Sequence, residues 1–208
     1  MKRVPRIKGI AALVVVFCSY LLWQWGPFSA VFAIANLTDP AKLEKLGDRG
    51  ANPRLNKTVY WLDMAERRVL APHIAIALAQ TINGAGGRQA ELTRNSLLRN
   101  LKIAHELGLL TADNREKLRR GHAAIITSGP YAGETVEIDH IVPFSLAPEL
   151  GNNLANLEMT PRTINRRKLD HVGPRQLEQA ALFFQAGLLN RESLEKVKAR
   201  VRTQDPVF

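Results

Sequence analysis

An aspartate and a histidine stand side by side in the run VEIDHIVP, and this pair could carry out hydrolysis assisted by a metal ion. The imidazole of His140 has an ordinary pKa of about 6.5, so it can accept a proton from water near neutral pH. The carboxylate of Asp139 is a hard oxygen donor of the kind that binds Mg²⁺. Together the two residues could activate a water molecule and hold a cation.

The surrounding pattern predicts the elements that must position this pair. β-Branched residues in the run 136–141 favour a short strand. A loop containing proline and glycine leads to a second apolar run at 154–159. Pro161 then fits the first turn of a helix, with Thr160 as its cap. Residues 134–168 therefore predict a strand, a loop, a second strand and a helix, each with a polar side chain.

The order of these elements and residues resembles the HNH endonuclease family, whose fold is a small ββα unit around a metal ion. The spacing looks much like that of the HNH domain of CRISPR effector nucleases, and the similarity covers residues 134–168. Adjacent residues of a strand point to opposite faces, so alternation alone would separate Asp139 from His140. The resemblance implies that the strand leads into a loop that lets both serve one site.

The resemblance also implies a role for each matching residue. His140 would be the general base that activates water, and Asn156 would fix the loop that supports this base. Asp139 and Asn165 would be the ligands of one divalent metal ion, with Mg²⁺ expected first and Mn²⁺ or another transition metal as alternatives. His171 could replace Asn165 as the second ligand, because an amide is a poorer metal ligand than an imidazole.

Basic residues surround Asn165 in the run RTINRRK. On a helix, Arg162 and Arg166 lie near the same face as Asn165, and Lys168 flanks that face. Beside a metal ion that receives a phosphate, these cations would bind the substrate phosphate. Such contacts position a nucleic-acid backbone without reading its sequence. We therefore expect cleavage of DNA with low sequence specificity, and RNA remains open as a substrate.

Composition indicates the kind of binding partner and excludes structures built on cysteine pairs. The formal net charge of +10 favours nucleic acid or an anionic membrane surface as the partner. Cys18 is the only cysteine, so neither an intramolecular disulfide nor a thiolate zinc site can form. We therefore expect no structural zinc, and nothing in the sequence indicates a protein partner.

The N-terminal segment, residues 1–35, indicates export or anchoring. A basic head precedes an uncharged apolar run at 10–23, as in a secretory signal. Ala33-Ile34-Ala35 would suit cleavage of a signal peptide, whereas a retained run of this kind could anchor the chain in a membrane. Both alternatives put the remainder outside the cytoplasm: in the periplasm, secreted, or anchored in the membrane.

We expect a mainly α protein with a small α+β unit, in which a ββα-metal (HNH) finger is flanked by helices and preceded by the signal or anchor segment. Helical spacing, proline and glycine predict helices at 59–70, 73–82, 89–107, 175–185 and 191–202. The expected divisions after residue 35 are a linker at 36–58, a helical region at 59–120, the nuclease unit at 121–173 and C-terminal helices at 174–208.

Two other functions fit parts of the sequence. A non-catalytic nucleic-acid-binding protein outside the cytoplasm could retain the HNH fold, and salt-sensitive binding without cleavage would identify it. A membrane-surface protein could use its basic helices on anionic lipid. The intact set of Asp139, His140 and Asn165 favours an HNH endonuclease that hydrolyses phosphodiester bonds.

Overall fold

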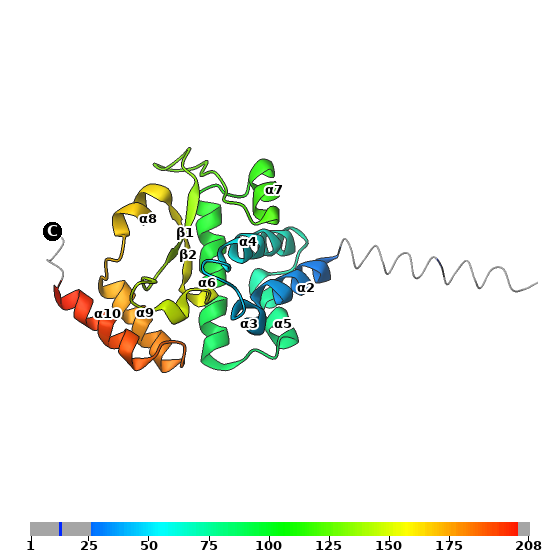
Figure 1. Cartoon of the computed structure of the whole chain (residues 1–208). Coiled ribbons are helices and arrows are strands. Elements are labelled where there is room, and N and C mark those ends of the chain that lie inside the picture. Colours follow the sequence, from blue (N-terminus) through cyan, green and yellow to red (C-terminus); the bar gives the residue numbers. More distant parts are fainter. Residues whose placement is uncertain (1–12, 14–25, 204–208) are drawn as a thin grey trace, which may run out of the picture.

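A computed structural model of the 208-residue chain describes Leu13 and residues 26–203. Between residues 26 and 203 the chain forms nine α-helices and one two-stranded antiparallel sheet (Figure 1). The prediction of a mainly helical protein with a small sheet is therefore confirmed. The basic head and the apolar run expected to direct export lie outside the described residues, apart from Leu13.

Six helices form the first half of the described chain: α2 (Pro27–Thr38), α3 (Pro40–Leu43), α4 (Asn52–Arg67), α5 (Pro72–Ile82), α6 (Gly87–Glu106) and α7 (Ala112–Arg120). The second half contains the strands β1 (Val136–His140) and β2 (Leu157–Pro161), then α8 (Arg162–Lys168), α9 (Pro174–Gln185) and α10 (Arg191–Thr203). The loop between the strands carries two short 3₁₀ turns, Pro148–Leu150 and Leu154–Asn156. Among the described residues, no helix is both long and apolar enough to cross a bilayer.

Proline and glycine set several helix boundaries as the sequence predicts. Pro72 occupies the first turn of α5, where its ring is tolerated, so α4 and α5 are separate helices. Gly108 and Gly187 follow the ends of α6 and α9 with φ of 64° and 72°, a conformation that glycine adopts without strain. The side chains of Thr111 and Asn190 then accept hydrogen bonds from the first turns of α7 and α10.

The prediction of a linker at 36–58 with at most one helical turn is wrong. α3 fits that one turn, but α4 begins at Asn52 rather than at Val59. Pro53 explains the earlier start, because proline in a first turn has a helical φ and loses no needed N–H group. The polar residues of this stretch indicated a linker, yet Leu55 is fully buried in the main core.

α2 crosses the division expected at residue 35. Four of its residues are buried in the main core: Ala30, Val31, Ile34 and Ala35. Arg68, at the end of α4, donates hydrogen bonds to the Gly26 carbonyl at 3.1 Å and to the Ser29 hydroxyl at 2.8 Å, which holds the first turn of α2. Residues 26–38 therefore belong to the folded part of the protein.

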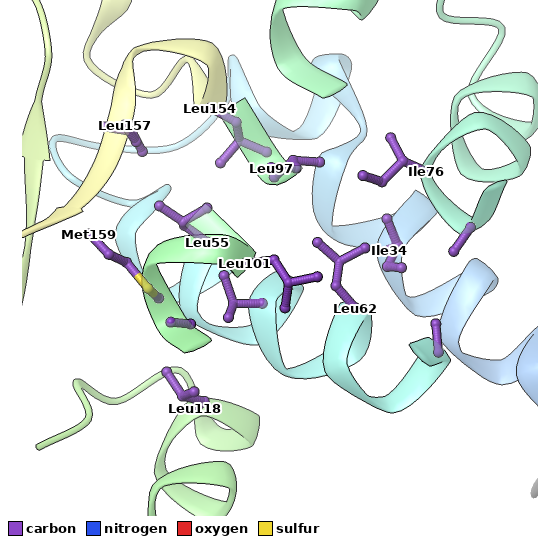
Figure 2. Close-up of a cluster of buried hydrophobic side chains, with 14 of the residues drawn as sticks. Ile34, Leu55, Leu62, Ile76, Leu97, Leu101, Leu118, Leu154, Leu157 and Met159 are labelled. Atoms are coloured by element: carbon purple, nitrogen blue, oxygen red, sulfur yellow. The ribbon is translucent and has the colours of Figure 1, made fainter. Parts of the chain in front are cut away.

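The hairpin of β1 and β2 lies between two hydrophobic clusters. The main core joins α2, α4, α5, α6 and α7 to one face of the hairpin, and Figure 2 shows leucines of α4 and α6 gathered with Leu157 and Met159 of β2. The second cluster joins the loop between the strands to α9 and α10, through Val142 and Phe183 among others. A lone two-stranded hairpin is marginally stable in water, so these helices supply the core it lacks.

Candidate active site

β1 presents its alternate side chains to two environments. Val136 and Ile138 pack against the main core, whereas Glu137 and Asp139 point to the other face. The antiparallel register places Asp139 directly opposite Glu158 of β2. One face of the hairpin is therefore apolar, and the other carries three carboxylates.

α8 lies over this polar face and is bonded to both carboxylates of β1. Asn165 Nδ2 donates to Glu137 Oε2 at 2.8 Å, and Lys168 Nζ donates to Asp139 Oδ2 at 2.7 Å. Lys168 also donates to the carbonyl oxygen of His140. The structure thus brings three of the predicted site residues, Asp139, Asn165 and Lys168, into one polar layer between β1 and α8.

The start of α8 differs from the prediction, because Thr160 is not its cap. Thr160 and Pro161 are the last residues of β2, and the helix begins at Arg162. Its first turn is held by Glu134, whose carboxylate accepts hydrogen bonds from the Thr163 N–H at 3.0 Å and the Thr163 hydroxyl at 2.6 Å. A carboxylate suits the positive end of a helix, and these hydrogen bonds hold the pKa of Glu134 below its usual range.

The Lys168–Asp139 ion pair is largely buried, with 16% and 13% of the two side chains exposed. Burial raises the pKa of Asp139, and the ammonium group of Lys168 opposes this shift. Losing either partner would leave the other as an unpaired buried charge, which is energetically costly. The two side chains therefore stay paired. In chemical terms, the pair offers a carboxylate to a cation and an ammonium group to an anion at the same place.

Arg162 and Arg166 surround Glu137 at the exposed edge of the polar layer. Arg162 Nε lies 3.4 Å from Glu137 Oε1, and Arg166 Nη2 lies 3.9 Å from the same oxygen. Exposed ion pairs contribute only about 0–1 kcal/mol. Both guanidinium groups can therefore leave Glu137 for a phosphate at little cost in stability.

Glu158 needs its own countercharges because it faces Asp139 across the hairpin, and like charges in that position repel. Arg99 of α6 places Nε 2.8 Å from Glu158 Oε1, and Arg175 of α9 donates to Glu158 Oε2 at 2.9 Å. Burial lowers the pKa of Arg99, while hydrogen bonding to Glu158 raises the pKa of Arg175. These two arginines tie the polar face to the helices on either side of it.

The ring of His140 lies at the end of β1, held by the loop. Its Nε2 is 2.9 Å from the carbonyl oxygen of Gly151. Because a carbonyl only accepts hydrogen bonds, Nε2 carries the proton, and Nδ1 keeps the lone pair of the neutral ring. The ring of Phe144 packs beside it with the two centroids 5.7 Å apart.

The expectation that a loop lets Asp139 and His140 face one site is wrong at this point, because both residues lie within β1. Strand alternation directs them to opposite faces, so they flank the end of β1 from its two sides. Burial lowers the pKa of His140, and Arg49 lowers it further, while the Gly151 carbonyl and Asp139 raise it. A histidine with a lowered pKa is neutral at pH 7, which is the form that a general base requires.

Asn156 is fully buried and fixes the loop that follows β1. Its Oδ1 accepts a hydrogen bond from the Val142 N–H at 2.8 Å, and its Nδ2 donates to the Val142 carbonyl at 3.0 Å. Its own carbonyl accepts from the Ile141 N–H at 2.8 Å. These three bonds hold the two residues that directly follow His140, which is the geometry that a loop-supporting role needs.

The far side of the loop packs on the connection between α3 and α4. Asn152 Oδ1 accepts a hydrogen bond from the Ala51 N–H at 3.0 Å, and Asn152 Nδ2 donates to carbonyl groups of the same connection. A Cβ atom on Gly151 would lie 2.6 Å from the Phe144 ring, so only glycine lets that ring pack here. The carbonyl that holds His140 therefore has a fixed position.

Two buried polar residues of α6 bind the outer edge of β2. Asn100 Nδ2 donates to the Leu157 carbonyl at 2.9 Å, and Asn100 Oδ1 accepts from the Met159 N–H at 2.7 Å. Ser96 donates to the carbonyl groups of Leu154 and Leu157 at 2.8 and 3.2 Å. The Asn100 amide thus takes the place of a neighbouring strand at the edge of the hairpin.

Replacing Asn100 with alanine should destabilise the protein by about 3 kcal/mol, since each buried backbone group left without a partner costs about 1–3 kcal/mol. Asn95→Ala is the matched control, because Asn95 is exposed on the same helix. Urea unfolding followed by circular dichroism measures both variants. Equal midpoints for the two would contradict the role given to Asn100.

The polar layer contains oxygen donors of the kind that a hard divalent cation binds. Within the described part of the chain, no three His, Cys, Asp or Glu side chains are grouped to hold a metal ion. The oxygen donors present are the carboxylates of Glu137 and Asp139 and the amide of Asn165, and Mg²⁺ commonly uses one or two carboxylates with water and substrate oxygens. His171 donates its backbone N–H to the Lys168 carbonyl, and no hydrogen bond joins its ring to the site among the residues described here.

Several residues of this site were not predicted from the sequence. Glu137 stands two positions before Asp139, so strand alternation could have placed both on one face. Ser96 and Asn100 form a polar i, i+4 pair beside the apolar stripe of a predicted helix, which signals a buried polar contact. Arg49 has no such local signal, since its charge acts on His140 from the distant α3–α4 connection.

No family model, no curated protein and no solved structure matches the chain. Its function is therefore inferred from the geometry of the polar layer and from the motif in residues 134–168.

Proposed function

We propose that the chain is a metal-dependent HNH endonuclease, in which residues 134–168 form a ββα-metal unit and the flanking helices support it. The observation that carries the proposal is the polar layer between β1 and α8, where Asp139, Asn165 and Lys168 gather beside the strand that ends at His140. Each of these residues matches the one that the HNH motif has at that point, and the elements follow in the same order.

In this proposal, Asp139 and Asn165 hold one divalent metal ion, Mg²⁺ in the first place and Mn²⁺ or another transition metal as alternatives. The ion would supply positive charge that stabilises the reacting phosphate and the leaving oxygen. Asn165 already lies in the polar layer, where Glu137 accepts from its Nδ2 and leaves the amide oxygen for the cation. His171 has no comparable contact in the described residues, so the geometry favours Asn165 over it as the second ligand.

His140 is the general base of the proposed reaction. Nδ1 takes a proton from the attacking water, because the Gly151 carbonyl holds the proton of Nε2. Burial keeps the ring neutral by lowering its pKa. Asn156 is a positioning residue in this scheme, since it acts through the backbone of Val142 rather than on substrate.

Lys168, Arg166 and Arg162 bind the phosphates of the nucleic acid. The two arginines are exposed and form only weak ion pairs with Glu137, so a phosphate can replace that carboxylate. A guanidinium group can also bind two phosphate oxygens at once. These contacts reach the backbone and leave the bases unread, so we propose DNA as the substrate, with low sequence specificity and RNA as an alternative.

The proposed location is outside the cytoplasm, in the periplasm, secreted, or anchored in the membrane by the N-terminal segment. Support comes from the basic head before the uncharged run at 10–23. A nuclease in that location would meet nucleic acid from outside the cell rather than the chromosome.

A cleavage assay on full-length protein in detergent tests the proposed function. Circular DNA and folded RNA are incubated with the protein in Mg²⁺, in Mn²⁺ or in EDTA. We expect nicked DNA with either metal, no product in EDTA, and recovery when Mg²⁺ is added in excess. Asp139→Asn should abolish cleavage, whereas Asp170→Asn should not, because Asp170 pairs with Arg200 away from the polar layer.

The same assay separates the proposal from its rival. Binding of nucleic acid that weakens with salt, without cleavage in any metal, would identify a non-catalytic nucleic-acid-binding protein that retains the HNH fold. Cleavage that persists in EDTA would rule out the metal-dependent reaction.

A further inference from the structure

Two neighbouring helices of this charged protein carry no Lys, Arg, Asp or Glu at all. They are α2 and α5, which pack against each other, in a chain where 23% of the residues are charged. Five of their large apolar side chains are between 40% and 59% exposed: Phe28, Phe32, Ile74, Leu78 and Ile82. We refer to these five residues as the apolar face.

The spacing shows that the exposed apolar residues follow one side of each helix, and the two helices pack against each other. Phe28 and Phe32 are four residues apart on α2, and Ile74, Leu78 and Ile82 repeat every four residues on α5, so each set follows one side of its helix. Other residues of both helices, among them Ile34 and Ile76, are buried in the main core. An exposed apolar surface of several large side chains usually marks an interaction site.

The apolar face begins close in sequence to the N-terminal apolar run. Gly26, just before α2, is separated by two residues from the end of the uncharged run at 10–23. Arg68 bonds the Gly26 carbonyl, and the next residue, Val69, is 96% exposed in the turn before α5. The exposed Val69 and the first turns of both helices therefore lie near Gly26, the residue that follows the N-terminal segment.

Burial of α2 also bears on the fate of that run. Cleavage after Ala35 would remove four residues from the main core, so a folded protein must keep α2. The uncharged run then remains attached to the domain unless it is cut before Gly26. A retained run of this kind, headed by basic residues, suits a lipid bilayer.

We propose that the apolar face lies in the lipid–water interface of the membrane that the N-terminal run enters, so that α2 and α5 rest on the bilayer. Apolar side chains of a helix that lies in this interface are buried among the lipid headgroups and upper acyl chains. In Figure 1, α2 and α5 are on the right of the molecule and α8 is on the left. The candidate active site therefore faces the aqueous phase, where nucleic acid can reach it.

This inference rests on the anchored form of the proposed location and is independent of the proposed catalysis. Nitroxide labels test it in full-length protein reconstituted in vesicles of equal parts phosphatidylglycerol and phosphatidylethanolamine. One label is attached through Leu78→Cys and a control label through Glu192→Cys, which is exposed on α10, with Cys18→Ser in both. Both sites are exposed, so the labels leave the core intact.

In vesicles, we expect the label at position 78 to gain access to molecular oxygen and lose access to a water-soluble nickel chelate. The label at position 192 should instead be more accessible to the chelate than to oxygen. Unchanged access of the chelate to position 78 would overturn the proposal. So would protection of position 78 before vesicles are added, since the apolar face would then be covered by the chain itself. Spin–spin broadening that unlabelled protein removes would show a second copy on this face and would also overturn it.

Discussion

His140→Ala should lower the rate of DNA cleavage by about 10²–10⁴-fold, the usual contribution of a general base. The variant should remain folded, because within the described residues the ring of His140 makes a single hydrogen bond, to the Gly151 carbonyl. Initial rates of nicking in saturating Mg²⁺ measure the effect, and thermal melting followed by circular dichroism checks the fold. The matched control is His105→Ala, since His105 is exposed on α6 and pairs with Glu66.

The pH dependence of cleavage gives a second measurement of the same residue. Burial lowers the pKa of His140, so the neutral base is lost only as the pH falls below about 6.5. Between the unfolded and folded pKa values the unfolded chain binds the proton first, so the free energy of unfolding also declines in that acid range. A wild-type rate still rising above pH 7, or undiminished cleavage by His140→Ala, would contradict the proposed mechanism.

A chain that starts at Asn36 should fail to fold, whereas a chain that starts at Gly26 should fold. The shorter chain lacks Val31 and Ile34, and burying a side chain of this size contributes about 1.5–3 kcal/mol. Two buried alanines are lost with them, and their neighbours in α4 and α5 become exposed. The total loss in the free energy of unfolding is about 5 kcal/mol or more, which is comparable to the whole stability of a typical domain.

Urea unfolding of the two truncated proteins measures this difference. The chain from Gly26 is the control, since it lacks the basic head and the apolar run but keeps all of α2. Its unfolding should be cooperative, while the chain from Asn36 should show little native signal even without urea. A cooperative transition in the chain from Asn36, with an equal midpoint, would mean that α2 is dispensable and that cleavage at Ala35 is compatible with the fold.

The helices could be predicted where a local rule decides them. Pro72, Gly108 and Gly187 delimit helices because their backbone preferences hold whatever surrounds them. The stretch around Asn52 was misjudged because its burial depends on contacts with distant helices. Pro53 is the one local signal of a helix start in this stretch, whereas the polar composition of the stretch indicates a linker.

The candidate site was predictable to a similar degree. Motif spacing predicted that Asp139, Asn165 and Lys168 would meet. The loop that was expected to let Asp139 and His140 serve one site is not found at that place, because both residues lie within β1 and alternate across it. The partner of Asn165 was not foreseen, because its bond to Glu137 depends on how far α8 lies along β1. The electrostatic effect of Arg49 on His140 joins segments far apart in the sequence, and no periodic pattern encodes it.

The hydrogen bonds of Asn100 have a consequence for how the hairpin finds its register. Along the edge of a strand, outward-facing backbone groups belong to every second residue, so a slip of one residue would turn those of Leu157 and Met159 away from α6. The hydrogen bonds of Asn100 therefore disfavour the slipped pairing, although Asn100 lies 59 positions from Met159 in the chain. Molecules of Asn100→Ala that pair out of register would misplace Asp139 relative to α8, so this variant should contain fewer active molecules rather than uniformly slower ones.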